Sequence, residues 1–293
     1  MPRFRVDHRT EYLYGRAMAD GFTSTHLEPR NAPGQQVLLA NLRIEPTPDE
    51  LEQVTDPWGN RVTLFAVHHP HESLLLHSIV EVEVESPPLP AHDPPWETVV
   101  RAAAAATGDL ALEVGPYLAL TEQTTVDTTD ALAALTSPEF VPGRGVVEAV
   151  RGLCGRIFGE FRFDPDVTDV STPLATVLVE RGGVCQDFAH VAVAALRSVG
   201  LPARYVSGYI ETQPPPGQPK LMGVDASHAW CSVWVGDHGW VDFDPTNDQM
   251  PPQRHVTVGW GRDYHDVTPV RGVVIGAGGT QSLTVAVDVT CLD

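Results

Sequence analysis

The stretch that decides the fold is RGGVCQDFAHVAVAALRSVGLPARYVSGYI, residues 181–210. A double glycine precedes Cys185, apolar residues then recur at helical spacing as far as Gly200, and Pro202 opens a strand. The spacing predicts an amphipathic helix that begins at Cys185. Its apolar stripe would contain Phe188, Ala192, Ala195, Leu196 and Val199. At a helix N-terminus the dipole and the free N–H groups favour a thiolate, so the position indicates a nucleophile as well as a core cysteine.

Two predicted strands downstream supply a histidine and a carboxylate. His228 opens HAWCSVWV, whose alternation places His228, Trp230, Ser232 and Trp234 on one face. A turn at residues 236–239 leads into WVDFDPTN, so we expect an antiparallel hairpin in which His228 and Asp244 are lateral neighbours. Cys185, His228 and Asp244 would then be nucleophile, base and orienting acid. Asp242, on the same strand face, is the alternative orienting residue.

These three motifs resemble the transglutaminase-like superfamily of papain-like cysteine enzymes, and more narrowly its bacterial members. The resemblance is carried by GGVCQDFAHVAVAALRSVGLPARYVSGYI, DASHAWCSVWV and GWVDFDPTN, and the core match covers residues 173–250. It implies a Cys185–His228–Asp244 triad. It also implies an α+β fold in which the helix that begins with the cysteine packs on an antiparallel sheet. LEPRNAPGQQV and DPWGNRVTLFAV further resemble the N-terminal domain of the same bacterial proteins.

The implied chemistry is thiol-dependent cleavage of an amide through a thioester acyl-enzyme, with hydrolysis of a peptide or isopeptide bond as the first expectation. Transamidation of protein glutamine and a non-catalytic peptide-binding module are the alternatives. The triad needs no cofactor and no metal. Papain-like proteases supply an oxyanion donor from a Gln six residues before the Cys. Val179 stands there in this chain, which leaves the Cys185 N–H as the first candidate.

The remaining sequence divides into segments of distinct character. Residues 1–90 alternate over several short runs and predict a β-sandwich-like domain or a small barrel. Residues 91–98 are a proline-rich linker, and residues 99–172 are a helical lead-in to the core. Residues 251–293 contain the turn IGAGG between two apolar runs and are expected to form a β-hairpin that completes the core sheet.

Several further residues are candidates for the cleft or for other sites. Gln186 and Trp230 lie next to the proposed nucleophile and base, and Asp263 and Tyr264 lie in a segment that resembles the region after the core in the bacterial proteins. The proline-rich loop 213–227 is either a cleft wall or a surface insertion. His190 is expected to be a packing or surface histidine. Three histidines around Pro70 could suggest a metal site, but a polar loop is favoured: His68, His69 and His71.

Composition narrows the possible partners. The net charge of −19 and a pI of about 4.9 argue against nucleic acid and anionic membranes as partners. The first residues lack the apolar segment of a signal peptide, and the four cysteines show no paired spacing. We therefore expect a cytoplasmic enzyme that acts on a peptide or protein amide. The sequence does not specify an oligomeric state.

Overall fold

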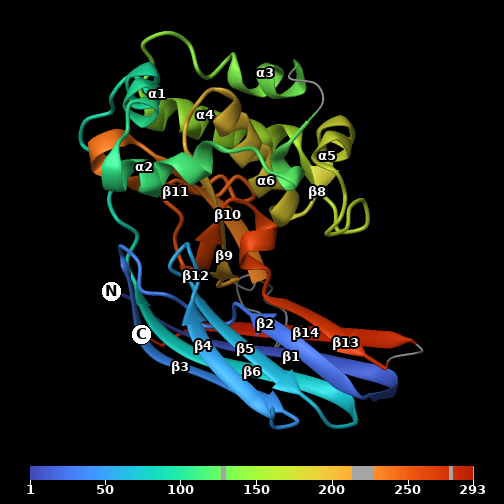
Figure 1. Ribbon diagram of the computed structural model, residues 1–293. Helices are drawn as coiled ribbons and strands as arrows, with labels where there is room; N and C mark the ends of the chain where they lie inside the picture. Colours follow the sequence, from blue (N-terminus) through green and yellow to red (C-terminus); the bar gives the residue numbers. More distant parts are fainter. Residues whose placement is uncertain (127–129, 213–226, 277–279, 293) are drawn as a thin grey trace, which may run out of the picture.

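The computed structural model describes residues 1–126, 130–212, 227–276 and 280–292. Helices gather at one end of the molecule and a pair of sheets at the other, with the sheet of β9 to β12 between them (Figure 1). Residues 213–226, nearly all of the loop expected beside His228, lie outside the described residues, as do residues 277–279 of the IGAGG turn. In the part of the chain that is described, no helix is both long and apolar enough to cross a membrane.

The N-terminal region forms two four-stranded antiparallel sheets, in the orders β14-β1-β6-β3 and β13-β2-β5-β4. Alternate residues of the long strand β6 are buried, as expected for a sheet with one covered face. A core that includes Phe65, Leu74 and Leu76 draws on both sheets, in agreement with the predicted β-sandwich. The first six strands are β1 (Arg3–Met18), β2 (Asp20–Thr25), β3 (Gln35–Glu45), β4 (Glu50–Thr55), β5 (Arg61–Val67) and β6 (His71–Val84).

The C-terminal strands correct the sequence expectation. β13 (Val270–Ile275) pairs with β2, and β14 (Gln281–Cys291) pairs with β1, so they extend the two N-terminal sheets and not the core sheet. Val287 and Val289 of β14 are fully buried in one cluster with residues of β1 and β6. The physical reason is that β1 and β2 each had one unpaired edge, and these edges accept a strand as readily as the core sheet does. Among the described strands of the predicted C-terminal extension, β12 (His255–Gly261) alone joins the core sheet.

Most of the chain between strand β6 and Cys185 is helical. The predicted helical lead-in contains α1 after the linker and α4, whose buried face includes Cys154. Pro173 is the N-cap residue of α5. The bounds are α1 (Trp96–Ala104), α2 (Gly108–Val114), α3 (Asp130–Thr136), α4 (Val146–Glu160) and α5 (Leu174–Glu180), with the 3₁₀ helices η1 (Gly115–Leu118), η2 (Glu122–Thr124), η3 (Gly236–His238) and η4 (Tyr264–Val267).

The core sheet has the order β11-β10-β9-β12, and α6 (Cys185–Ser198) packs on β10 and β9. Every α6 residue from Asp187 to Arg197 is buried, so the expectation of an amphipathic helix is wrong. Helices α3, α4 and α5 pack against α6, and its many alanines allow close approach from all sides. The other strands are β7 (Arg162–Phe163), β8 (Gly182–Gly183), β9 (Ala203–Ile210), β10 (Ser227–Trp234) and β11 (Trp240–Phe243).

Candidate active site

The cysteine is placed by a short parallel pairing and a capped helix start. β8 pairs with β7, and α6 begins at Cys185 as the sequence predicts. The Asp187 carboxylate accepts hydrogen bonds from the Val184 N–H at 2.8 Å and from the Thr168 hydroxyl at 2.7 Å, and so caps the helix. A Cβ at Gly183 would lie 2.4 Å from that carboxylate. Glycine is therefore required there for the cap to form, and the cap fixes where the thiol stands.

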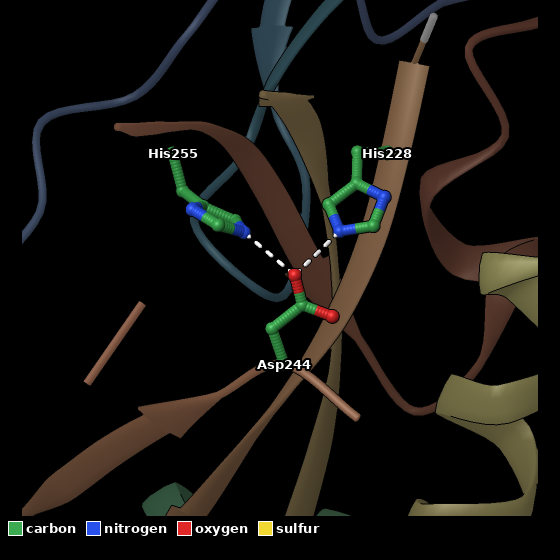
Figure 2. A group of neighbouring side chains, drawn as sticks. All are labelled: His228, Asp244 and His255. Carbon is green, nitrogen blue, oxygen red and sulfur yellow. Dashed lines mark hydrogen bonds and ion pairs between the residues drawn. The ribbon is translucent and has the colours of Figure 1, made fainter. Parts of the chain in front are cut away.

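The histidine and the aspartate are neighbours across the predicted hairpin. Pairing of Cys231 with Phe243 aligns β10 and β11, and His228 Nε2 lies 2.8 Å from Asp244 Oδ2 (Figure 2). The two residues are 7% and 0% exposed. The expected adjacency is confirmed. The alternative orienting residue, Asp242, instead accepts a hydrogen bond from Trp230 Nε1 at 3.2 Å.

The Asp244 carboxylate is held by donors on both oxygens. Oδ1 accepts from the backbone N–H groups of Thr246 and Asn247 at 2.9 and 3.3 Å. Oδ2 accepts from the Asn247 side-chain amide at 2.7 Å and faces His255 Nε2 at 2.8 Å, in addition to His228. The Cys154 thiol donates to the Asp244 carbonyl at 3.3 Å, which ties this loop to α4. The carboxylate is therefore fixed in one orientation.

These contacts set the charge state of the site. Burial alone would raise the pKa of Asp244, but hydrogen bonds from His228 and His255 hold it well below its usual range. Burial alone would lower the pKa of His228, but hydrogen bonding and charge from Asp244 and Cys185 raise it to about 10. His228 is then an imidazolium at neutral pH.

Trp230 forms one wall of the site. Its ring lies 6.0 Å from the His228 ring at an interplanar angle of 25°, and 5.0 Å from the His255 ring, edge to face. Gly208 is paired with His228 across β9, and a Cβ there would lie 2.7 Å from the Trp230 ring. The glycine therefore makes room for the indole. Trp230 is fully buried, so it keeps water away from one side of both imidazoles.

A cleft of about 860 Å³ opens beside His228. Part of its wall is the turn that follows Asp244, and part comes from the ends of β7 and β9. Its described lining residues are Phe163, Ile210, Glu211, Thr212, His228, Thr246, Asn247, Gln249, Met250, Pro251, Gln253 and Arg254. The cleft is large enough to take part of a peptide chain.

The other cysteines have different environments. Cys154 and Cys231 are buried, and burial raises the pKa of each thiol far above its usual value. Cys231 donates to the Ala189 carbonyl, and both residues belong to the main hydrophobic core. Cys185 is only half-buried. A buried, neutral thiol is a poor nucleophile, so Cys185 is distinguished from these two by its surroundings.

The remaining predicted cleft residues lie around α6. Gln186 is half-buried in the first turn of α6, and its amide donates to the Val170 carbonyl at 3.4 Å. Asp263 is buried and caps η4, while the Tyr264 N–H donates to His190 Nε2 at 3.2 Å. Neither Asp263 nor Tyr264 is among the described residues that line the cleft at His228. Their contact with substrate stays a prediction.

Two side chains at the site escaped the sequence reasoning. His255, at the start of β12, and Asn247, in the turn after Asp244, both contact the triad carboxylate. Asn247 carried a weak signal, because it follows the D-P-T motif by one residue. His255 carried none, because its position depends on β12 pairing with β9. That pairing is not readable from local sequence.

Three side chains of the site are also suitable ligands for a metal ion. His228, Asp244 and His255 offer ligand atoms that lie within 4.8 Å of one another. Two imidazoles and a carboxylate suit zinc and other divalent transition metals. In the observed geometry the atoms hydrogen-bond one another, so a metal would have to displace the protons that both Nε2 atoms share with Asp244.

Both the N-terminal region and the core of the chain match known protein families. Residues 135–245 match the transglutaminase-like superfamily, and residues 4–83 match the bacterial transglutaminase-like N-terminal region. An uncharacterized protein of Mycobacterium tuberculosis is 41% identical over 98% of this chain and 92% of its own length. An uncharacterized protein of Mycobacterium leprae is 34% identical over 100% of both chains. A protein-glutamine gamma-glutamyltransferase of Pseudomonas aeruginosa is 37% identical over 25% of this chain and 11% of its own.

A solved structure shares the whole architecture. The "putative cysteine protease" of Cytophaga hutchinsonii superposes with a TM-score of 0.74 at 21% identity, covering 100% of this chain and 91% of that chain. The likeness extends over both the strand-rich N-terminal region and the helix–sheet core. The predicted α+β fold is confirmed.

Proposed function

The chain belongs to the transglutaminase-like superfamily, and we propose that it is an enzyme that cleaves peptide or isopeptide amides through a thioester on Cys185. One observation carries the proposal: a buried His228 is held by Asp244 at 2.8 Å and also interacts with the Cys185 thiol. A cysteine, a histidine and an orienting carboxylate in this arrangement have the chemistry of nucleophilic acyl transfer.

The proposed reaction has two halves. The Cys185 thiolate attacks the amide carbonyl carbon, and the C–N bond then breaks as the His228 imidazolium gives its proton to the leaving amine. The thioester is then attacked by water, which His228 deprotonates, and the C–S bond breaks to release a carboxylic acid and restore the thiolate. Asp244 keeps the His228 ring oriented through both halves. The Cys185 N–H at the start of α6 is the proposed first oxyanion donor.

Transamidation is the second candidate. The local similarity to a protein-glutamine gamma-glutamyltransferase favours it, because in that reaction an amine takes the place of water in the second half. We place hydrolysis first because water needs no binding site of its own, whereas an amine acceptor does. Cys154, Cys185 and Cys231 are free thiols, which supports the further proposal of a reducing, cytoplasmic location.

The test is to trap the thioester and then vary the acceptor. A set of peptides with activated C-terminal esters or γ-glutamyl amides is incubated with the protein, and intact mass is measured with and without hydroxylamine. We expect an acyl adduct on Cys185 that hydroxylamine removes, free acid in water, and no adduct on Cys185→Ala. Release of free acid at the same rate when millimolar amines are present supports hydrolysis, and efficient amine incorporation supports transamidation. Tight peptide binding with no adduct would identify a binding module and contradict the proposed enzyme.

A further inference from the structure

The geometry points to His255 as a positioning residue of the proposed triad: its Nε2 donates to the same Asp244 carboxylate oxygen that holds His228. The inference rests on the proposed function. His228 Nε2 and His255 Nε2 both lie 2.8 Å from Asp244 Oδ2, and they approach that oxygen from two different strands (Figure 2). One carboxylate oxygen of Asp244 therefore contacts two histidines.

Hydrogen-bond geometry fixes the protons on His255. Its Nδ1 lies 2.6 Å from the Gln253 carbonyl, which can only accept, so Nδ1 carries a proton. Its Nε2 lies 2.8 Å from the Asp244 carboxylate, which also only accepts when ionised. Both ring nitrogens of His255 therefore face acceptors, one on the Gln253 backbone and one on the triad carboxylate, so the ring is held at two points.

The surroundings of His255 hold its ring in place. Its Nε2 contacts Asp244 at 2.8 Å, and its ring centroid lies 5.4 Å from that of His228 on β10. Trp230 covers the ring edge-on at 5.0 Å. His255 is 6% exposed. A buried ring with a hydrogen-bond partner on each nitrogen is kept in one orientation.

Because His228 and His255 share one oxygen of Asp244, His255 affects how the proposed base is held. The hydrogen bond with His255 Nε2 prevents the Asp244 carboxylate from rotating, so Oδ2 stays in place for His228. His255 therefore acts on the reaction through Asp244 and His228 and touches no reacting atom.

His255 and His228 line different cavities. The cavity at His255 has a volume of about 620 Å³, and its wall includes Arg204, Trp240, Asp242 and Trp260. His228 is not among the described residues of that wall and lines the cleft described above. Removing the ring would therefore leave a space open to the cavity. A free imidazole molecule could enter this space and replace the missing side chain.

The experiment uses the full chain and the rate of Cys185 alkylation by iodoacetamide across pH, read by intact mass. We expect His255→Ala to slow alkylation at pH 6 on the order of 10- to 100-fold, the range that outer-shell partners of metal-bound histidines contribute. Millimolar imidazole should restore most of the rate. His255→Gln keeps an amide donor, so we expect it to retain more of the rate than His255→Ala. His8→Gln is the matched control, because His8 is also buried and doubly hydrogen-bonded, to Tyr209 and Thr10.

The outcomes separate the two proposals. If wild type and His228→Ala alkylate alike, the proposed function fails. If His228→Ala is slow but His255→Ala matches wild type, or is slow without rescue by imidazole, the positioning role is refuted. Should His255→Ala not fold, ¹⁵N spectra of the wild type decide: we expect a proton on the His255 Nε2 that faces Asp244, and an unprotonated Nε2 overturns the inference.

Discussion

Two groups of histidines in this molecule have opposite properties. In the turn between β5 and β6, His68 pairs with Asp20 at 2.8 Å and His69 with Asp49 at 3.1 Å, and their side chains are 35% and 46% exposed. In the core, two histidines from separate strands share one oxygen of a buried carboxylate. The turn group is dense in sequence but spreads over separate carboxylates. The buried site forms because separate strands bring their side chains together, and a cluster of histidines along the sequence does not predict such a site.

The largest expected difference between the two groups comes from the carboxylates. Asp244→Asn puts an amide N–H or a weaker acceptor in front of two ring donors, so we expect alkylation of Cys185 at pH 6 to fall by up to about 10⁴-fold, the loss in kcat when a triad aspartate is neutralised. Asp49→Asn changes an exposed partner of His69 and should leave the rate unchanged. Equal rates for Asp244→Asn and wild type, with folding verified by circular dichroism, would sink the assignment of Asp244.

The second difference concerns pH and stability. The pKa of His228 is raised to about 10, so its interactions stabilise the fold fully below its unfolded value near 6.5, and the gain is lost as pH rises from there through the folded value. We expect the free energy of unfolding of wild type to decline over that window by on the order of a few kcal/mol relative to His228→Gln. Urea unfolding at pH 6, 8 and 10 measures it. Parallel curves for the two proteins would contradict the raised pKa.

A smaller effect is expected at the wall of the site. Trp230→Phe removes the hydrogen bond to Asp242 and part of the ring that lies against both imidazoles. We expect a loss of about 1–3 kcal/mol in unfolding free energy, since a buried carboxylate is left with one donor fewer. Thermal and urea unfolding provide the readout. A variant as stable as wild type would show that the indole N–H contributes nothing at this site.

The smallest effect is expected in the turn. The double variant His68→Ala and His69→Ala removes three exposed ion pairs, and such pairs contribute little in water. We expect unfolding free energy within about 0.5 kcal/mol of wild type and an unchanged alkylation rate. A large change in either quantity would mean that this turn has a role that its contacts do not reveal.

The local parts of the site could be predicted from sequence. Cys185 at a helix start and His228 opposite Asp244 follow from glycine, helix period and hairpin spacing, all of which act over short distances. The features that depend on pairing between distant strands could not be predicted from the sequence. His255 reaches Asp244 because β12 pairs with β9, and β14 leaves the core for β1 because that edge was open. The burial of α6 on every side likewise depends on helices that local periodicity does not place.

The most direct test of the central claim is intact-mass labelling with iodoacetamide at pH 6, comparing wild type with His228→Ala. At this pH an ordinary thiol is almost entirely protonated and reacts slowly. We expect rapid modification of one residue, Cys185, in the wild type, and a marked slowing in the variant. Slow and identical labelling of the two proteins would show that no base-activated thiolate exists, and would contradict the Cys185–His228–Asp244 assignment.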